Sequence, residues 1–177
     1  MKIPIGMEDG QDNPIAQRVK VAYPDHYIGA TLFRSDLSIH IEKSALLPIC
    51  RFLHDDPELD FDYLIHMTSV DYPNVATRFE MVYELFSIQK KHQARIKARV
   101  AEADCAIESV TSIWKGAEFL EREVYDMMGI QFNHHPNLKR ILLPDEYREG
   151  YPLRKDFPVE GRGWRDTFEF IEPHVEP

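Results

Sequence analysis

Carboxylates, an arginine and two histidines gather in the stretch EREVYDMMGIQFNHH, residues 121–135. A carboxylate beside a histidine can act as a general base or bind a metal ion, provided that a cleft and an orienting partner are present. His134 and His135 are adjacent in a loop rich in Asn and Pro, so a zinc site would need ligands from elsewhere in the chain. Cys50 and Cys105 form no local pair, and two thiols are too few for an iron–sulfur cluster.

The common signatures of nucleotide and zinc sites are also absent from the sequence: GxGxxG, GxxxxGK(S/T) and HExxH. We therefore expect no catalytic, cofactor-binding or metal-binding residue in this chain. We expect both cysteines to be buried free thiols.

The same charged residues also suit a docking surface. They fall on a helix that the pattern predicts over about residues 116–128, with Gly129 as the residue that ends it. The apolar residues of this helix share one face: Ala117, Leu120, Val124, Met127 and Met128. Glu118, Arg122 and Asp126 follow the opposite face at i, i+4 and i+8, which predicts a surface or interface ladder of ion pairs worth about 0.2–0.5 kcal/mol each. Glu121 and Glu123 flank the apolar face on either side.

The composition limits the class of protein. A chain of 177 residues with 44% hydrophobic residues is typical of one globular domain. The formal charge of −9 argues against nucleic acid as a partner, since nucleic-acid binding usually needs a basic surface. The N-terminus has no apolar segment of a secretory signal, and nothing approaches the roughly 18 apolar residues of a membrane span. Any membrane association is therefore expected to go through a partner.

Hydrophobic periodicity places two helices and five strands ahead of the charged helix. The first helix starts at Asn13-Pro14 and stops before Pro24, and the second is capped by Ser44 and contains Pro48 in its first turn. The predicted strands are 27–33, 37–41, 61–70, 78–89 and 94–100, with Ser35-Asp36 as the turn of the first hairpin. The element order is α-β-β-α-β-β-β-α. The short links favour antiparallel pairing, so we expect an α+β fold with an antiparallel or mixed sheet and helices packed on it.

The chain changes character from Asn133 onward. Six of its twelve prolines lie between Pro136 and Pro177, and no helical or strand pattern lasts. The segment is nevertheless rich in apolar residues, which include Tyr147, Tyr151, Leu153, Phe157, Trp164 and Phe168. Residues 139–165 carry seven Lys or Arg and five Asp or Glu, against the acidic balance of the whole chain. We predict a leader at 1–12, an α+β domain at 13–132 and an extended tail at 133–177 that lies on a partner chain or on its own domain.

These residues resemble a known family. The pattern is carried by Glu121, Arg122, Glu123, Asp126, Met127, Met128, His135, Lys139, Ile141 and Leu142. With the tail sequence LLPDEYREGYPLRKDF that follows, it is similar to the signature of the hydrophilic C-type (NuoC-type, 30 kDa) subunit of proton-pumping NADH:quinone oxidoreductase, respiratory complex I. The resemblance covers about residues 110–163 closely. It departs at Glu118-Phe119, where the family leads one to expect Asn-Trp.

The resemblance implies a non-redox scaffold subunit of the peripheral arm of that complex. FMN, iron–sulfur clusters and quinone would lie in partner subunits, and the complex would couple electron transfer from NADH to a quinone with proton translocation. The implied partners are the quinone-cavity (D-type) subunit and neighbouring iron–sulfur subunits. The chain would then lie at the cytoplasmic face of the inner membrane, peripheral and held through its partners.

The expected interface and structural residues lie in the helix and the tail. They are Glu121, Arg122, Glu123, Asp126, His135, Lys139, Arg140, Arg154, Lys155 and Asp156. We expect the first four to fix the helix against the tail or a neighbour, and the tail residues to pin the tail. Two other functions stay open: the same module in a related membrane-bound hydrogenase or a dehydrogenase with another electron donor, and a free-standing hydrolase that uses the His/Glu cluster.

Overall fold

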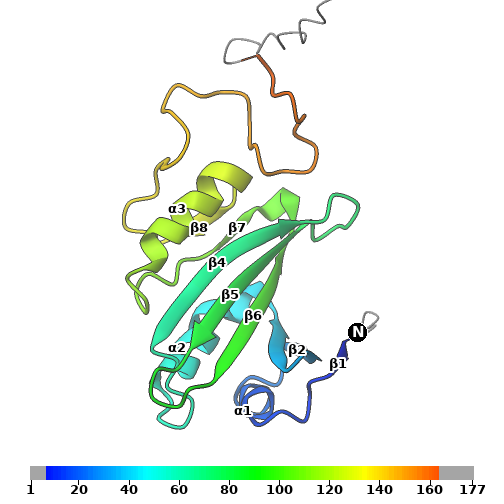
Figure 1. Ribbon diagram of the computed structural model, residues 1–177, viewed down its shortest axis with the longest axis vertical. Helices are drawn as coiled ribbons and strands as arrows, with labels where there is room; N and C mark the ends of the chain where they lie inside the picture. Colours follow the sequence, from blue (N-terminus) through cyan, green and yellow to red (C-terminus); the bar gives the residue numbers. More distant parts are fainter. Residues whose placement is uncertain (1–6, 164–177) are drawn as a thin grey trace, which may run out of the picture.

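Six strands form one mixed sheet in the order β1-β2-β3-β6-β5-β4 (Figure 1). They are β1 (Glu8–Asp9), β2 (Tyr27–Phe33), β3 (Asp36–Ile41), β4 (Tyr63–Asp71), β5 (Phe79–Phe86) and β6 (Gln93–Val100). Neighbouring strands are antiparallel except for β3 and β6, which run parallel at the centre of the sheet. The predicted α+β class with a mixed sheet is confirmed. This computed structural model describes residues 7–163, so Trp164 and Phe168 of the predicted tail lie outside the described residues.

The first hairpin differs from its prediction by one residue. Arg34 and Ser35 form the turn, with φ of 50° and 73°, and Phe33 pairs with Asp36. A two-residue hairpin turn favours positive φ at both positions because its twist then matches that of the strands. The prediction of Ser35-Asp36 as the turn is therefore wrong by one position.

The three helices are α1 (Pro14–Ala22), α2 (Leu46–Asp55) and α3 (Ala117–Met128). The Asn13 side chain accepts the amide of Ile15 at 2.9 Å, as the cap prediction requires. Ser44 does not cap α2: it lies in the 3-10 turn η1 (Lys43–Ala45), and the capping position is taken by Ala45. At the other end of the chain, Gly129 ends α3 with φ of 75°, as predicted.

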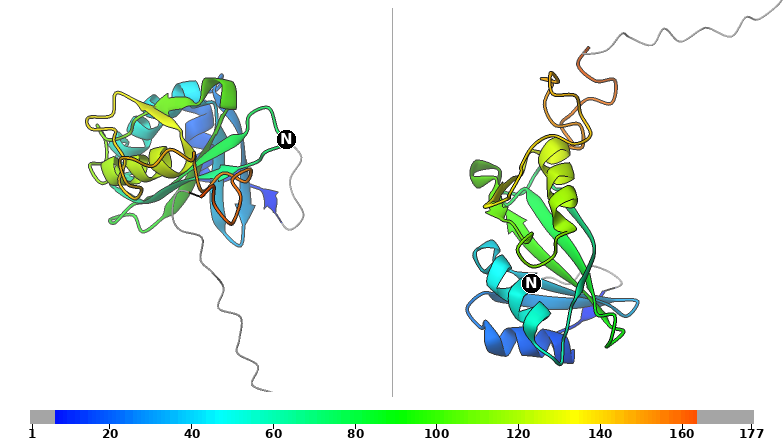
Figure 2. Two further views of the ribbon diagram at one scale, coloured as in Figure 1. Left: turned by 90° about the horizontal axis from the view of Figure 1, so that it is seen from above. Right: turned by 90° about the vertical axis from the view of Figure 1, so that its left-hand side faces the viewer.

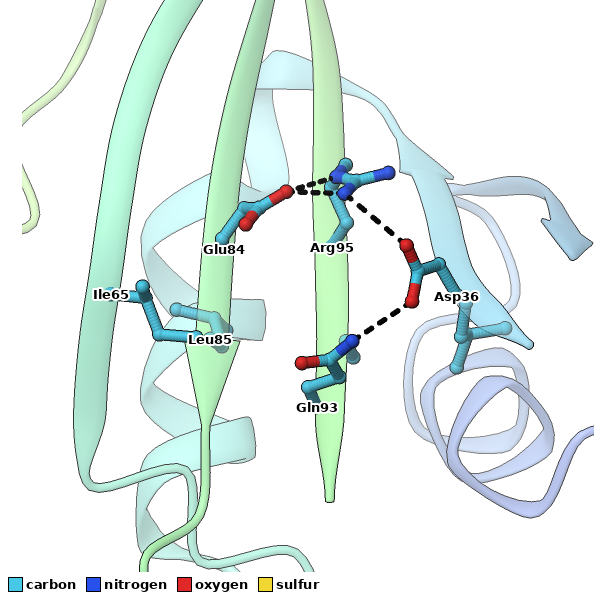
Figure 3. A pocket seen from close by; sticks show the side chains of 8 residues that line it. Asp36, Ile65, Glu84, Leu85, Gln93 and Arg95 are labelled. Carbon is cyan, nitrogen blue, oxygen red and sulfur yellow. Dashed lines mark hydrogen bonds and ion pairs between the residues drawn. The ribbon is translucent and has the colours of Figure 1, made fainter. Parts of the chain in front are cut away.

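Buried residues of all three helices and of the sheet form one hydrophobic core. Its largest fully buried side chains include Tyr83, Phe61, Phe79, Leu46 and Leu53. The opposite face of the sheet is polar. There Arg95 lies between Glu84 and Asp36 (Figure 3), and Glu80 pairs with Lys97 and Arg99. The alternation along β6, with Ala94, Ile96, Ala98 and Val100 buried, produces this two-sided sheet.

A second, two-stranded parallel sheet joins the segment before α3 to the segment after it. Its strands are β7 (Ala106–Glu108), which follows the 3-10 turn η2 (Glu102–Asp104), and β8 (Gln131–Asn133). The sequence did not predict either strand, nor β1 within the expected loose leader. Ile107 and Phe132 anchor the small sheet in the core. Because two residues separate β8 from the end of α3, the chain reverses direction there and runs back beside the helix.

Residues 134–163, which we call the strap, contain no helix or strand. They run across the end of the molecule that carries α3 (Figures 1 and 2). The strap thus lies on its own domain along part of its length, and the tail prediction left this possibility open.

Candidate functional site

Three charged side chains of α3 face inward or toward the strap. Glu121, Arg122 and Asp126 are 0%, 9% and 1% exposed. The ion-pair ladder predicted among Glu118, Arg122 and Asp126, on a surface or interface face, is wrong, because the strap covers this side of the helix and supplies the partners of Arg122 and Asp126. Arg122 and Asp126 use their polar groups on the strap backbone.

The carboxylate of Asp126 is enclosed by donors from the strap. Its Oδ2 accepts the backbone amides of Ile141, Leu142 and Leu143 at 3.1, 2.9 and 2.8 Å. Its Oδ1 accepts Nη1 of Arg140 at 2.8 Å. Burial alone would raise the pKa of Asp126, but the three amides and the charge of Arg140 outweigh it and hold this pKa below its ordinary value. Asp126 is therefore ionised and fixes three consecutive strap residues.

Arg122 binds the carbonyl groups of the adjoining strap residues. Its Nε and Nη2 donate to the carbonyl oxygens of Lys139 and Arg140 at 3.1 and 2.9 Å. Arg122 thus donates to the carbonyl groups of residues 139–140, and Asp126 accepts hydrogen bonds from the amides of residues 141–143. We call these contacts the first clasp.

A second clasp fixes residues 154–156 of the strap to the sheet. Arg78, just before β5, donates to both carboxylate oxygens of Asp71 at 2.7 and 2.8 Å. It also pairs with Glu102 and Asp156 at 2.8 and 3.0 Å. The amide of Lys155 donates to Asp71 Oδ2 at 2.8 Å. The hydrogen bonds from Arg78 are the main cause that lowers the pKa of Asp71, followed on the lowering side by the Lys155 amide. The fully buried Asp71 carboxylate is therefore an ionised anchor.

The end of α3 contributes its free carbonyl groups to the second clasp. Arg154 Nε donates to the carbonyl of Met128 at 2.7 Å, and the amide of Leu153 donates to that of Met127 at 3.1 Å. The last carbonyls of a helix lack intrahelical partners and carry its negative dipole end, so a guanidinium is favourable there.

Glu121 lies in a different environment from Asp126. Its Oε1 accepts the amide of Val110 at 2.7 Å, whereas its buried Oε2 has no hydrogen-bond partner among the described residues. Burial raises the pKa of Glu121 to about 7, against the opposing effects of Ser109 and Val110. The nearest basic group is His135, whose Nε2 lies 3.8 Å from Oε2 with both side chains fully enclosed.

The structure brings most of the expected residues together in three groups. Glu121 meets His135, the first clasp joins Arg122 and Asp126 to residues 139–143, and the second clasp contains Arg154, Lys155 and Asp156. Lys139 contributes its carbonyl rather than its ammonium group. Glu123 is half-buried on α3.

Sequence reasoning missed Arg78, Asp71 and Glu102. An acid and a base on either side of the turn DYPNVATR were visible in the sequence as a possible pair across a hairpin. Nothing in that pattern indicated that the strap would join them.

The arrangement is suited to holding a chain segment. A substrate could reach Glu121 and His135 only if the strap moved, because both side chains are enclosed. Within residues 7–163, no group of three or more His, Cys, Asp or Glu side chains is placed to hold a metal ion. A hollow on the polar sheet face is lined by Asp36, Ile65, Glu84, Gln93 and Arg95 (Figure 3). Its charged side chains pair with one another, because Arg95 contacts both Asp36 and Glu84.

Fold and site together define an α+β domain that carries a strap fixed by two polar clasps. The family model described as "Respiratory-chain NADH dehydrogenase, 30 Kd subunit" matches residues 39–163, and the chain belongs to this family. The match includes both clasps.

Curated relatives agree with the family. The chain is 44% identical over 158 residues to the C-type subunit of NADH-quinone oxidoreductase from Roseiflexus castenholzii, covering 89% of this chain and 90% of the relative. It is 40% identical over 151 residues to the corresponding subunit from Citrifermentans bemidjiense, covering 85% and 92%.

Two solved structures share the fold. A trypsin-resistant fragment (1-134) of Nqo5 is 25% identical with a TM-score of 0.59, covering 70% of this chain and 96% of that one. A chain of the membrane-bound sulfane sulfur reductase, an archaeal respiratory membrane complex, is 23% identical with a TM-score of 0.69, covering 82% and 84%. Within the described residues, no helix is long and apolar enough to cross a membrane.

Proposed function

We propose that this chain is a non-redox scaffold subunit in the peripheral arm of NADH:quinone oxidoreductase, docked on the quinone-cavity (D-type) subunit beside iron–sulfur subunits. The complex transfers electrons from NADH to a quinone and couples the transfer to proton translocation. FMN, the clusters and the quinone are held by partner subunits. The chain itself lies at the cytoplasmic face of the inner membrane and is held there through these partners.

The observation that carries the proposal is the two-sided character of the strap. Its inner side is used by the two clasps, and its outer side exposes Ile141, Leu142, Leu153 and Val159 at 37%, 59%, 54% and 104%. Apolar side chains left in water on an irregular segment are typical of a surface that another chain covers. The clasps fix the strap backbone and so prearrange these side chains, which lowers the entropic cost of docking.

The solved Nqo5 fragment gives independent support. It is resistant to trypsin, and it covers 70% of this chain. A domain of this kind is therefore stable as a unit, which agrees with a strap that serves contacts outside its own core.

A related respiratory complex is the second candidate. The fold of the archaeal sulfane sulfur reductase chain favours it, and a membrane-bound hydrogenase or another dehydrogenase belongs to the same alternative. The two curated relatives described above, at 40–44% identity, are named as subunits of NADH-quinone oxidoreductase, which favours the first candidate. Identification of the subunits that co-purify with the native chain decides between them. A free-standing hydrolase is disfavoured by the enclosed Glu121 and His135, and turnover by the purified chain alone would revive it.

The docking proposal is tested with two substitutions on the outer side of the strap. Leu142→Gln and Leu153→Gln together remove exposed apolar groups and leave the backbone atoms of the clasps in place. We expect the variant to bind the co-expressed D-type subunit at least about tenfold more weakly, the equivalent of about 1.4 kcal/mol, in a pull-down titration.

Val21→Gln is the matched control, because Val21 is 79% exposed on α1, away from the strap. It should bind as the unsubstituted chain does. All these variants should unfold within about 0.5 kcal/mol of the parent, as surface substitutions usually do. Equal binding by the strap variant and the control would refute docking through the strap.

A further inference from the structure

The buried carboxyl of Glu121 has a donor for one oxygen only. The amide of Val110 serves Oε1, and Oε2 has no hydrogen-bond partner among the described residues. An ionised carboxylate in this position would hold an unpaired charge away from water, which is costly. The protonation state of Glu121 therefore depends on whether His135, 3.8 Å away, supplies a positive charge.

The hydrogen bonds of the His135 ring to the backbone show whether the ring carries a positive charge. Its Nε2 lies 3.1 Å from the carbonyl oxygen of Glu118, which can only accept, so Nε2 carries a hydrogen. Its Nδ1 lies 3.0 Å from the amide of Asn137, which can only donate, so Nδ1 presents its lone pair. The imidazole is thus neutral in this geometry, and Glu121 holds its own proton.

The other groups around Glu121 supply no charge. Tyr83 on β5 and Cys50 on α2 interact with it electrostatically, and burial keeps the pKa of both well above their ordinary values, so both are neutral. Ser109, in the segment before α3, contributes a hydroxyl. Among the described residues, no Lys or Arg forms an ion pair with Glu121. Its pKa of about 7 agrees with this environment.

We propose that Glu121 and His135 form a proton-operated latch at the start of the strap, closed when Glu121 is protonated and His135 is neutral. Loss of the proton to solvent leaves a buried negative charge beside His135. The nearest donor that can reach that charge is the Nε2 hydrogen of His135, which must then leave the Glu118 carbonyl. This movement of the neutral ring draws Nδ1 away from the Asn137 amide and breaks that hydrogen bond. The turn at residues 135–137 then opens, and the strap loosens ahead of the first clasp.

The latch would make the position of the strap depend on pH. Its effect on docking rests on the proposed function, but the latch itself does not. The closing experiment uses the isolated full chain without a partner. The latch can therefore fail while docking through the strap stands, and docking can fail while the latch stands.

The test is an NMR titration of the full chain from pH 5 to 9. The carboxyl carbon of Glu121 is followed with ¹³C labelling, and the amide of Asn137 with ¹⁵N labelling. We expect both signals to shift along one curve with a midpoint near pH 7. In Glu121→Gln, which mimics the protonated acid, the Asn137 signal should stay at its low-pH position throughout.

Glu123→Gln is the matched control on the same helix and should reproduce the midpoint of the parent. A Glu121 midpoint below pH 5, a Glu121 that stays protonated to pH 9, or an Asn137 amide that ignores the titration would each overturn the latch. If Glu121→Gln does not fold, the titrations of the parent and of Glu123→Gln still decide the question.

Discussion

Two buried carboxyl groups lie five residues apart on helix α3, and their surroundings drive them to opposite protonation states. Asp126 receives four hydrogen bonds, three from strap amides and one from Arg140, and its pKa is lowered. Burial raises the pKa of Glu121 to about 7, because its carboxyl receives only one backbone amide, from Val110, and a side-chain hydrogen bond from Ser109. Both are essentially inaccessible to solvent, so burial alone does not decide the charge.

The difference lies in what covers each group. The strap backbone covers Asp126 and presents unpaired amides, which stabilise an anion. Core side chains and a neutral imidazole cover Glu121, and they stabilise the acid form. The strap is therefore attached through the charge of one residue, and its start is sensitive to the charge of the other.

The largest expected effect is the loss of the Asp126 charge. Asp126→Ala leaves three strap amides and Arg140 without an acceptor, so residues 140–143 should leave the helix. We expect stability to fall by about 3 kcal/mol, as for the removal of one partner of a buried polar network. Urea unfolding measures the loss, and faster tryptic cleavage after Lys139 and Arg140 reports the released strap. Unchanged cleavage would show that the first clasp does not hold the strap.

The second-largest expected effect is on the pH dependence of stability, which Glu121 changes in the direction opposite to Asp126. The folded chain binds this proton more tightly than the unfolded chain, in which the ordinary pKa is 4.5. Its contribution to stability is therefore complete below pH 4.5, decreases as the pH rises to about 7 and stays level above that, a loss of about 3 kcal/mol at most. Glu121→Gln should be more stable than the parent at pH 8 by about 2 kcal/mol, with little difference at pH 5.

Urea unfolding at the two pH values checks this sign. A variant that is less stable than the parent at pH 8 would mean that the ionised carboxylate is stabilised after all. Asp126 gives the opposite dependence: its lowered pKa makes its contribution complete above its ordinary value of 3.8 and lost as the pH falls through the lower value in the folded chain.

The third effect concerns the residue that ends the helix. Gly129 has φ of 75°, and a Cβ added there would lie 2.4 Å from the ring of Tyr151. Gly129→Ala should cost about 1–2 kcal/mol through the left-handed backbone and displacement of that ring. Thermal unfolding measures it, and Gly116→Ala, with open space around its Cβ, is the control that should cost less.

The smallest expected loss of stability comes from a substitution that removes the Arg140 guanidinium from Asp126 and leaves the three strap amides in place. Arg140→Met removes one of its four donors and leaves the three amides. Because Arg140 is a quarter exposed, we expect a cost of about 1 kcal/mol and an intact strap by tryptic cleavage at Lys139. A loss equal to that of Asp126→Ala would mean that the ion pair, and not the backbone amides, fixes the strap.

Local signals in the sequence predicted much of the fold. Asn13-Pro14 and Gly129 mark helix ends through their own chemistry, and alternation identified the longer strands. Strands β7 and β8 could not be predicted, because three residues with one buried side chain each show no periodicity. The position of Ser44 also misled, since a 3-10 turn precedes α2.

The candidate residues were predictable by type but not by environment. A helical wheel separates apolar from polar positions, and it placed Arg122 and Asp126 on a surface or interface face without showing what covers them. Their burial arises from a strap that returns over the helix, which no local pattern contains. The same limit applies to Asp71 and Arg78, whose partners Lys155 and Asp156 lie more than seventy residues further along the chain.

The most direct test of the central claim is removal of residues 140–177, followed by two measurements on the same preparation. The claim is that the strap serves docking and the domain stands without it. Binding to the D-type subunit should fall at least about a hundredfold, about 2.7 kcal/mol, while thermal unfolding remains cooperative and shifts by about 10 °C, as the loss of the clasps requires. A truncated chain that binds as the full chain does, or that no longer folds, would contradict the claim.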